Sequence, residues 1–219
     1  MDNKKNTILL TVIAVATLLV AVVGATFAYF TAQGGTGTSA NVTVTTGTAA
    51  SSDFGTFGAI NIYADASTFA KGKPDATGTT TGTVSWTAPG ATTTTTPSEA
   101  DRSFCYTADL IITANTFTKS AANTANAKEL YFTAVKGSTT LVDEQSLVTL
   151  PAGTAVTGTI NIPTTKGGDV LKHKLIAEAG KTVSDSWTIT VTLKNLEVDQ
   201  NENTGKQLTG SIKFTKVAC

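Results

Sequence analysis

The feature that most constrains this chain is a period of two in its apolar residues, which recurs along most of the sequence after residue 40. Successive side chains of a β-strand point to opposite faces, so this period predicts strands with one buried face and one solvated face. Three segments show it most clearly: 104–112, 187–194 and 208–215. In the second of these, Trp187, Ile189, Val191 and Leu193 alternate with polar residues. We therefore expect long amphipathic strands at all three places.

Seven shorter segments carry a weaker strand pattern, and glycine, proline or asparagine residues separate them. They are 41–46, 59–63, 83–87, 129–135, 145–150, 155–162 and 171–177. Beyond residue 30, no segment of the sequence has the apolar spacing of an amphipathic helix. Many short strands with turn residues between them predict an all-β fold, an antiparallel β-sandwich.

An apolar run from residue 8 to residue 30 follows Lys4 and Lys5. Basic residues before such a run hold the N-terminus in the cytoplasm and direct the rest of the chain across the membrane. The run is long enough to span a bilayer, but it ends in the small residues that a signal peptidase requires. We expect cleavage between Ala28 and Tyr29, with the bond between Ala25 and Thr26 as the second choice; an uncleaved membrane anchor is the alternative. Either way, the sequence predicts a secreted, extracellular or cell-surface protein.

Composition and glycine content suggest how the exported part is organised. Lys plus Arg equals Asp plus Glu, 16 of each, so no basic field exists to bind nucleic acid. After the leader, 1–28, residues 29–46 include the Gly-rich stretch 31–40 and are expected to form a flexible arm. Residues 47–219 suffice for a single sandwich domain. Within it, the Thr- and Pro-rich segment 88–100 is predicted to be an exposed loop.

The sequence has two cysteines, Cys105 and Cys219, and both follow the leader. Disulfides persist outside the cell, and an even cysteine count favours a structural bridge. That bridge would attach the last residue to the middle of the chain. Free thiols, or pairing between two subunits, are the alternatives.

Residues typical of catalysis form no recognisable motif. His173 is the one histidine, and its place between Leu171 and Leu175 is more typical of a core residue than of a general base. The glycines at 34–37 follow an apolar run instead of opening a helix in a βαβ unit, as a phosphate-binding loop would. We therefore predict that the protein is not an enzyme and has no organic cofactor.

A candidate metal site lies between the last two clear strands, in the segment 199–205. Oxygen-bearing side chains at Asp199, Asn201 and Asn203, followed by Gly205, resemble the alternating ligands of a calcium loop. The glycine comes one position later than in the helix-flanked motif, and the bidentate acidic ligand is absent. An ordinary hairpin turn uses the same residue types. Both interpretations, calcium site and turn, stay open at this point.

Three features together resemble the TasA and camelysin family of exported proteins from Gram-positive bacteria. They are the leader ending GATFAYFTA, the segment WTITVTLKNLEVDQNENTGKQLTGSIKF that begins at Trp187, and the terminal Cys219. The leader is similar to substrates of the SipW-type signal peptidase, which would cut after Ala28. The resemblance implies a jelly-roll β-sandwich and assembly into biofilm matrix fibres or a surface coat, with itself or related matrix proteins as partners. It also implies that each subunit donates its N-terminal segment as a strand to a neighbour.

The hydrogen-bonding capacity of sheet edges independently supports assembly by strand donation. The edge of a sheet has unpaired backbone groups that an extended segment of another chain can fill. Tyr29, Phe30, Val42 and Val44 are the candidate donor residues, and the membrane would hold residues 8–30 until cleavage. The sequence thus predicts an exported structural subunit that assembles by strand addition. The alternative is a monomeric surface-displayed binding module or adhesin that uses its exposed loops.

Overall fold

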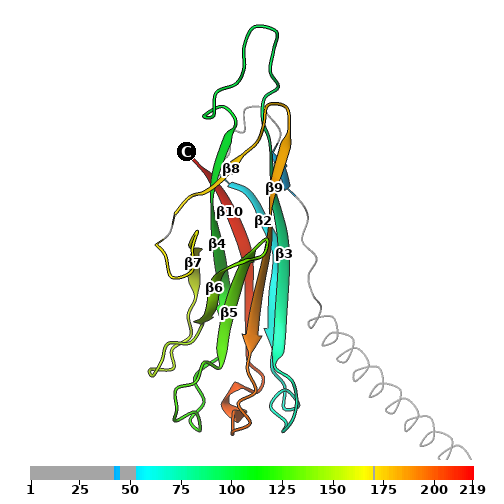
Figure 1. Cartoon of the computed structure of the whole chain (residues 1–219). Coiled ribbons are helices and arrows are strands. Elements are labelled where there is room, and N and C mark those ends of the chain that lie inside the picture. The colour runs from blue at the N-terminus through cyan, green and yellow to red at the C-terminus, as the bar shows by residue number, and fades with distance from the viewer. Residues whose placement is uncertain (1–41, 45–52, 170) are drawn as a thin grey trace, which may run out of the picture. The chain divides into compact units, whose positions relative to one another are not determined.

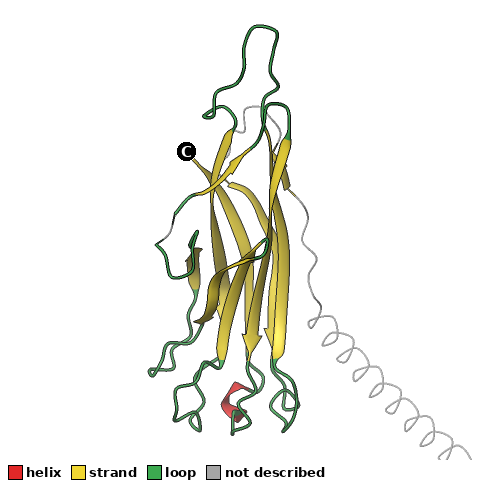
Figure 2. Ribbon diagram, viewed as in Figure 1, coloured by secondary structure: helices red, strands yellow, loops and turns green. Residues whose placement is uncertain are grey.

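The computed structural model describes residues 42–44, 53–169 and 171–219. Within these ranges the regular structure is β-strand, apart from one 3-10 turn at Asn201–Asn203 (Figure 2). The expected N-terminal helix and the cleavage site lie outside the described residues. No helix among the described residues is long and apolar enough to cross a membrane.

The strands form two five-stranded sheets, and β8 is the fifth strand of the second one (Figure 1). Sheet A has the order β1-β3-β9-β5-β6, and sheet B has the order β2-β10-β4-β7, with β8 also paired to β4. Sheet A contains β1 (Val42–Val44), β3 (Ala76–Thr87), β9 (Thr182–Leu193), β5 (Leu130–Lys136) and β6 (Thr139–Ser146). Sheet B contains β2 (Asp53–Tyr63), β10 (Gln207–Val217), β4 (Ser103–Asn115), β7 (Gly158–Ile162) and β8 (His173–Ile176).

Pairing is antiparallel throughout both sheets except at β1, which lies parallel to β3. The all-β prediction, and that of an antiparallel sandwich, are therefore confirmed. Residues 88–100 contain neither helix nor strand, and residues 91–96 are all exposed.

The core lies between the sheets and is built from the inward positions that the period of two predicted. On β9 these are Trp187, Ile189, Val191 and Leu193, each at most 1% exposed. They face inward residues of β4 and β10, such as Leu110 and Phe214. Burying side chains of this size stabilises the fold by about 1.5 to 3 kcal/mol each, which is why these three strands carry the clearest sequence pattern.

One predicted strand is wrong. The sequence pattern favoured 145–150, whereas the strand is β6, at Thr139–Ser146. Gly137 has a φ of +59°, which allows a tight turn directly after β5, so β6 begins earlier than expected. Residues 149–154 form a turn instead, where the Thr149 amide donates to the Thr154 carbonyl.

Candidate functional site

The N-terminal arm contributes one strand to the described structure. β1 pairs with the outer edge of β3, in the register Val42 to Val84 and Val44 to Trp86. Among the described residues, β1 is the only strand on this side of β3 and reaches three of its twelve positions. The other two candidate donor residues, Tyr29 and Phe30, lie outside the described residues. An extended segment of the arm therefore already makes main-chain pairs at a sheet edge.

Near its first residues, β3 packs closely against β2 of sheet B. A Cβ atom built on Gly78 would lie 3.0 Å from the Asn61 carbonyl oxygen and 3.2 Å from side-chain atoms of Ile60 and Ile62. The two sheets approach so closely here that only glycine fits without movement of the β2 backbone. Close packing of β3 on β2 therefore leaves no gap between the two sheets at Gly78.

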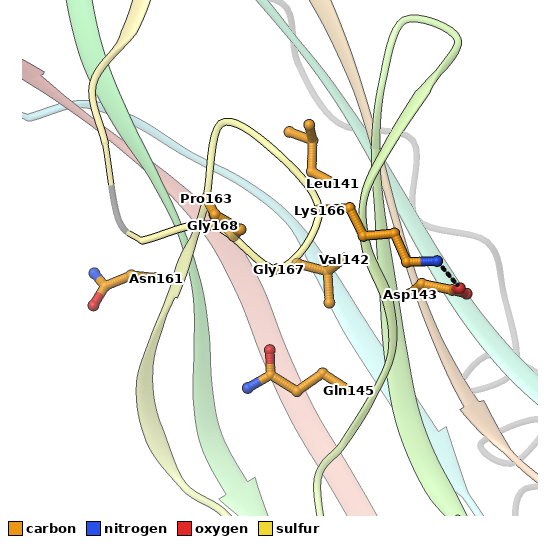
Figure 3. A pocket seen from close by; sticks show the side chains of 9 residues that line it. All are labelled: Leu141, Val142, Asp143, Gln145, Asn161, Pro163, Lys166, Gly167 and Gly168. Carbon is orange, nitrogen blue, oxygen red and sulfur yellow. Dashed lines mark hydrogen bonds and ion pairs between the residues drawn. The ribbon is translucent and has the colours of Figure 1, made fainter.

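The opposite side has a cleft between β6 of sheet A and the segment that leaves β7. The cleft has a volume of about 380 Å³, and Leu141 and Val142 contribute apolar surface (Figure 3). Its polar lining includes Gln145 and Asn161. Lys166 spans it, with its ammonium 2.6 Å from the Asp143 carboxylate. The cleft is large enough for a small polar ligand.

The outer edge of β6 is poorly suited to accept a strand. Its pairing with β5 is irregular near Ala134, and Glu144 has a φ of +51°. The exposed carboxylates of Asp143 and Glu144 lie at the irregularity. Bulges and charges are the usual features that stop an edge from pairing with another chain.

The predicted calcium segment forms a turn whose asparagine is used internally. Asn203 is fully buried, its side-chain oxygen accepts from the Thr118 amide at 2.9 Å, and its NH₂ donates to the Thr118 carbonyl at 2.8 Å. Asp199 is exposed and accepts a hydrogen bond from the Asn201 amide at 3.1 Å. Of the three predicted ligands, Asn203 is thus buried with its side-chain oxygen hydrogen-bonded, whereas Asp199 is exposed. Calcium binding stays a prediction.

A buried carboxylate, Glu129, lies beside this turn. It is 3% exposed and accepts hydrogen bonds from the Ser120 amide at 2.8 Å and hydroxyl at 2.7 Å, and from the Asn123 side chain at 2.7 Å. The side-chain amides of Gln200 and Asn203 each donate to it at 3.3 Å. We call these five residues the Glu129 cluster. It joins the loop before β5 to the loop between β9 and β10.

Sequence reasoning missed the Glu129 cluster. Its members are between 3 and 83 residues from one another, and each taken alone is an ordinary loop residue. The described residues contain no group of three or more His, Cys, Asp or Glu side chains able to hold a metal ion. The cluster therefore holds its carboxylate with neutral hydrogen-bond donors, an arrangement that stabilises loops.

A second polar group lies inside the aromatic part of the core. The Tyr106 hydroxyl donates to the Asp185 carboxylate and accepts from the Trp187 indole N–H at 3.1 Å. The Lys136 ammonium is 3.4 Å from the same carboxylate. Burial, with the Asp185 hydrogen bond as a second cause, raises the pKa of Tyr106 far above its ordinary value. Tyr106 therefore remains a neutral donor.

His173 packs into this aromatic group. Its ring stacks on Tyr106 at 5.3 Å and meets Trp187 edge-on at 4.9 Å. Nε2 lies 3.4 Å from the Ile162 carbonyl, and Nδ1 has no partner among the described residues. Burial, followed by the nearby Lys136 charge, lowers the pKa of His173 to about 4. A neutral, buried ring agrees with the expectation of a core histidine.

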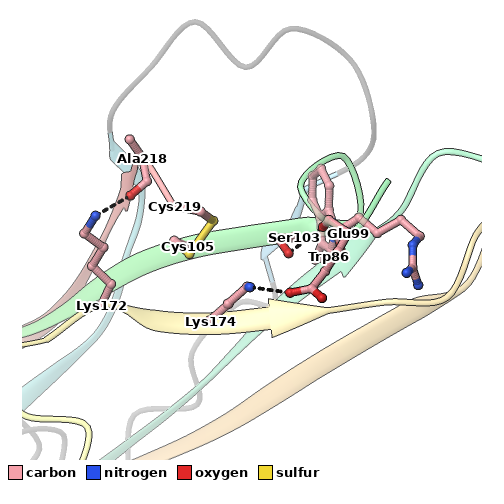
Figure 4. The surroundings of a disulfide bond; sticks show 9 residues. Trp86, Glu99, Ser103, Cys105, Lys172, Lys174, Ala218 and Cys219 are labelled. Atoms are coloured by element: carbon pink, nitrogen blue, oxygen red, sulfur yellow. Dashed lines mark hydrogen bonds and ion pairs between the residues drawn. A yellow bond between two sulfur atoms is a disulfide. The ribbon is translucent and has the colours of Figure 1, made fainter. Parts of the chain in front are cut away.

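Cys105 and Cys219 form a disulfide (Figure 4). The bridge joins β4 to the residues after β10. The two strands pair with each other up to Val217 on β10 and Cys105 on β4. The Lys172 ammonium donates to the Ala218 carbonyl at 2.8 Å beside it. Of the alternatives for the cysteines, the structure has the intramolecular bridge, a bond typical of oxidising compartments.

Comparisons with protein-family models, curated proteins and solved structures find no match for this chain.

Replacing Glu129 by Ala should lower the free energy of unfolding by about 2 to 4 kcal/mol, because several buried donors lose their acceptor at once. Urea denaturation of the purified protein measures this. Glu202→Gln is the matched control, since Glu202 is exposed and accepts one amide hydrogen bond, from Ala121. It should change stability by less than about 0.5 kcal/mol. Equal effects of the two substitutions would show that the Glu129 cluster contributes no more to the free energy of unfolding than an exposed carboxylate does.

Acid should destabilise the fold through His173. The unfolded chain binds a proton near pH 6.5, whereas the folded protein does so only near pH 4. The resulting stability is complete above pH 6.5 and is lost as pH falls through this window, by about 2 kcal/mol between pH 7 and pH 5. His173→Phe keeps a ring but cannot titrate. Urea titrations at both pH values should show a shallower pH dependence for this variant, and identical slopes would contradict the assignment.

Removing the disulfide with Cys219→Ser should lower the free energy of unfolding by about 2 to 4 kcal/mol, since the bridge closes a loop with a sequence separation of 114 residues. The double variant with Cys105→Ser tests whether a lone thiol adds any effect. Calorimetry under non-reducing conditions should find both variants less stable to a similar degree. Wild-type stability that is unaffected by reductant would refute this role for the bridge.

Proposed function

We propose that this protein is an exported structural subunit that assembles into an extracellular fibre, matrix or surface coat by strand addition. The observation that carries the proposal is β1: three residues of the N-terminal arm pair with the outer edge of β3. The same main-chain hydrogen bonds form whether the strand comes from the same chain or from a neighbour. Exchange between chains therefore costs little interaction energy.

The geometry of such an exchange favours a polymer. A donor strand and an acceptor edge are different surfaces of one subunit, so the contact is heterologous. A heterologous contact that does not close into a ring continues as a filament. Within sheet A, the protected edge of β6 leaves the part of β3 beyond Gly78 as the favoured acceptor. The resemblance to the TasA and camelysin family, with its jelly-roll topology, fits this mode of assembly.

The disulfide and the lack of a recognised catalytic motif are compatible with this structural role. The disulfide suits an oxidising, extracellular environment. The leader would keep Tyr29 and Phe30 at the membrane until signal peptidase cuts after Ala28, so the arm would become free only after export. We propose no enzymatic activity.

A second candidate is a monomeric binding module. The cleft of about 380 Å³ near Lys166 and the exposed loop 88–100 are the features that favour it. In this role the sandwich would support loops that contact a ligand. Persistently monomeric mature protein in electron micrographs would favour this candidate over the fibre.

Deleting residues 29–46 from the mature protein should abolish polymerisation and leave a folded monomer, because the deletion removes the donor and leaves strands β2 to β10 intact. Electron microscopy and circular dichroism together measure both results. Filaments formed by the truncated protein would refute assembly through this segment.

Cysteine pairing separates exchange between chains from pairing within one chain. Thr43 lies opposite Ser85 in the β1–β3 register. One protein with Thr43→Cys is mixed with another carrying Ser85→Cys under mild oxidation. Cross-linked dimers are expected if the strand is exchanged. Thr43→Cys mixed with Thr113→Cys, on sheet B, is the matched control and should yield no specific dimer. Failure to cross-link, in material that still forms filaments, would place the acceptor elsewhere.

A further inference from the structure

The outward face of sheet A is covered by hydroxyl side chains. On β3 the buried positions are even-numbered, and on β9 every odd-numbered position from Trp187 onward is buried, so the alternate positions point outward. Of these outward positions, Thr192 is only 8% exposed. These outward residues face each other in six directly opposed pairs. The pairs are Thr77–Thr192, Thr79–Thr190, Thr81–Thr188, Thr83–Ser186, Ser85–Ser184 and Thr87–Thr182. We call this set the hydroxyl face.

Some of these pairs hydrogen-bond to each other across the strands. The hydroxyls of Thr79 and Thr190 are 3.1 Å apart, and those of Thr87 and Thr182 are 2.8 Å apart. β5 continues the face on the other side of β9, with Thr133 opposite Thr190 and Val135 opposite Thr188. Its third outward residue, Tyr131, lies opposite Thr192 at the end of the face and is 9% exposed. β3 and β9 run side by side along the sandwich (Figure 1). The result is a regular array of hydroxyl and methyl groups.

Charge separates this face from the other outward face. The six pairs and the outward residues of β5 include no charged side chain. On sheet B, Lys213 lies directly opposite Asp109, which is 8% exposed and accepts a hydrogen bond from the Asn161 side chain. An exported protein normally spreads charge over exposed sheets, which keeps copies apart. The chain has 32 charged residues, and sheet A has its exposed carboxylates on β6, at Asp143 and Glu144, beyond these three strands.

We propose that the hydroxyl face binds the hydroxyl face of a second copy of this chain. A hydroxyl both donates and accepts, so a surface of hydroxyls is complementary to itself, and a neutral face meets no like-charge repulsion. Such an isologous contact has two-fold symmetry. It uses the face of sheet A and not its edge, so it does not rest on strand exchange at β3.

The available area sets the strength of this contact. Fifteen outward positions on β3, β9 and β5, each about 4.8 by 6.8 Å, give a face of about 490 Å² per copy, or about 1000 Å² in the pair. That total is at the lower limit for a specific interface, so two single subunits should associate weakly. Subunits repeated along a fibre would present the face many times, and avidity would then hold fibres side by side.

The test places charge at the centre of the face. Thr81 and Thr188 form a central pair, and Thr81 is exposed, so Thr81→Lys should fold normally. Concentration-dependent NMR shifts of the exported protein should map to the hydroxyl face and yield its dissociation constant. Thr81→Lys should raise that constant at least tenfold. Mixing Thr81→Lys with Thr81→Glu protein should restore association, which a merely structural effect cannot do.

Ser211→Lys is the matched control, because Ser211 is an outward, mid-strand hydroxyl on sheet B. It should leave the dissociation constant unchanged. An equal loss in this control, no loss in Thr81→Lys, or no rescue on mixing overturns the proposal. Shifts at the hydroxyl face that require an added β-glucan, without any dependence on protein concentration, would also overturn it and assign the face to a saccharide.

Discussion

Unpaired backbone groups at the sheet edges are the constraint on which the rest of this structure depends. A sandwich buries the faces of its sheets but leaves edges whose N–H and C=O groups must be paired, hydrated or shielded. The chain treats them differently. Gly78 brings β3 against β2, the irregularity at Glu144 and its charges protect β6, and β1 pairs with three positions of β3. Among the described strands, it is the arm that covers part of β3, and this asymmetry is the basis of the proposal that β3 accepts a strand from another chain.

The interior follows a related rule for its two buried carboxylate groups, because an unpartnered buried polar group is costly. Glu129 satisfies its carboxylate with neutral donors from two loops, and Asp185 is paired with Tyr106 and Lys136. The first arrangement holds the loops beside β5 and β10 in place. The second holds aromatic rings of both sheets together. Strands kept in register by such contacts present stable edges and faces, which a building block requires.

The sequence predicted those strands whose two faces differ. β4, β9 and β10 were found because apolar side chains such as Ile189 fill the core and threonines face water. Most of β3 was missed, since Gly78, Thr80 and Gly82 occupy its inward positions and leave no apolar period. At Gly78 the close approach to β2 leaves no room for a larger residue, so the missing pattern there is itself a consequence of packing. β6 was misplaced because its irregular pairing breaks the period.

The candidate sites were harder to predict because they depend on contacts distant in sequence. The turn at Asn203 was identified from its residue types, but its role as an anchor requires Thr118, 85 residues away. The hydroxyl face shows the same limit. Alternating threonines in a strand indicate only that one face of the strand is exposed to solvent. The pairing register, with Thr79 opposite Thr190, is needed to show that the threonines of two strands form one surface. Edge pairing extends a sheet along its hydrogen bonds, whereas face pairing acts at right angles to it. The two proposed contacts, strand addition at β3 and pairing of hydroxyl faces, would therefore act in independent directions.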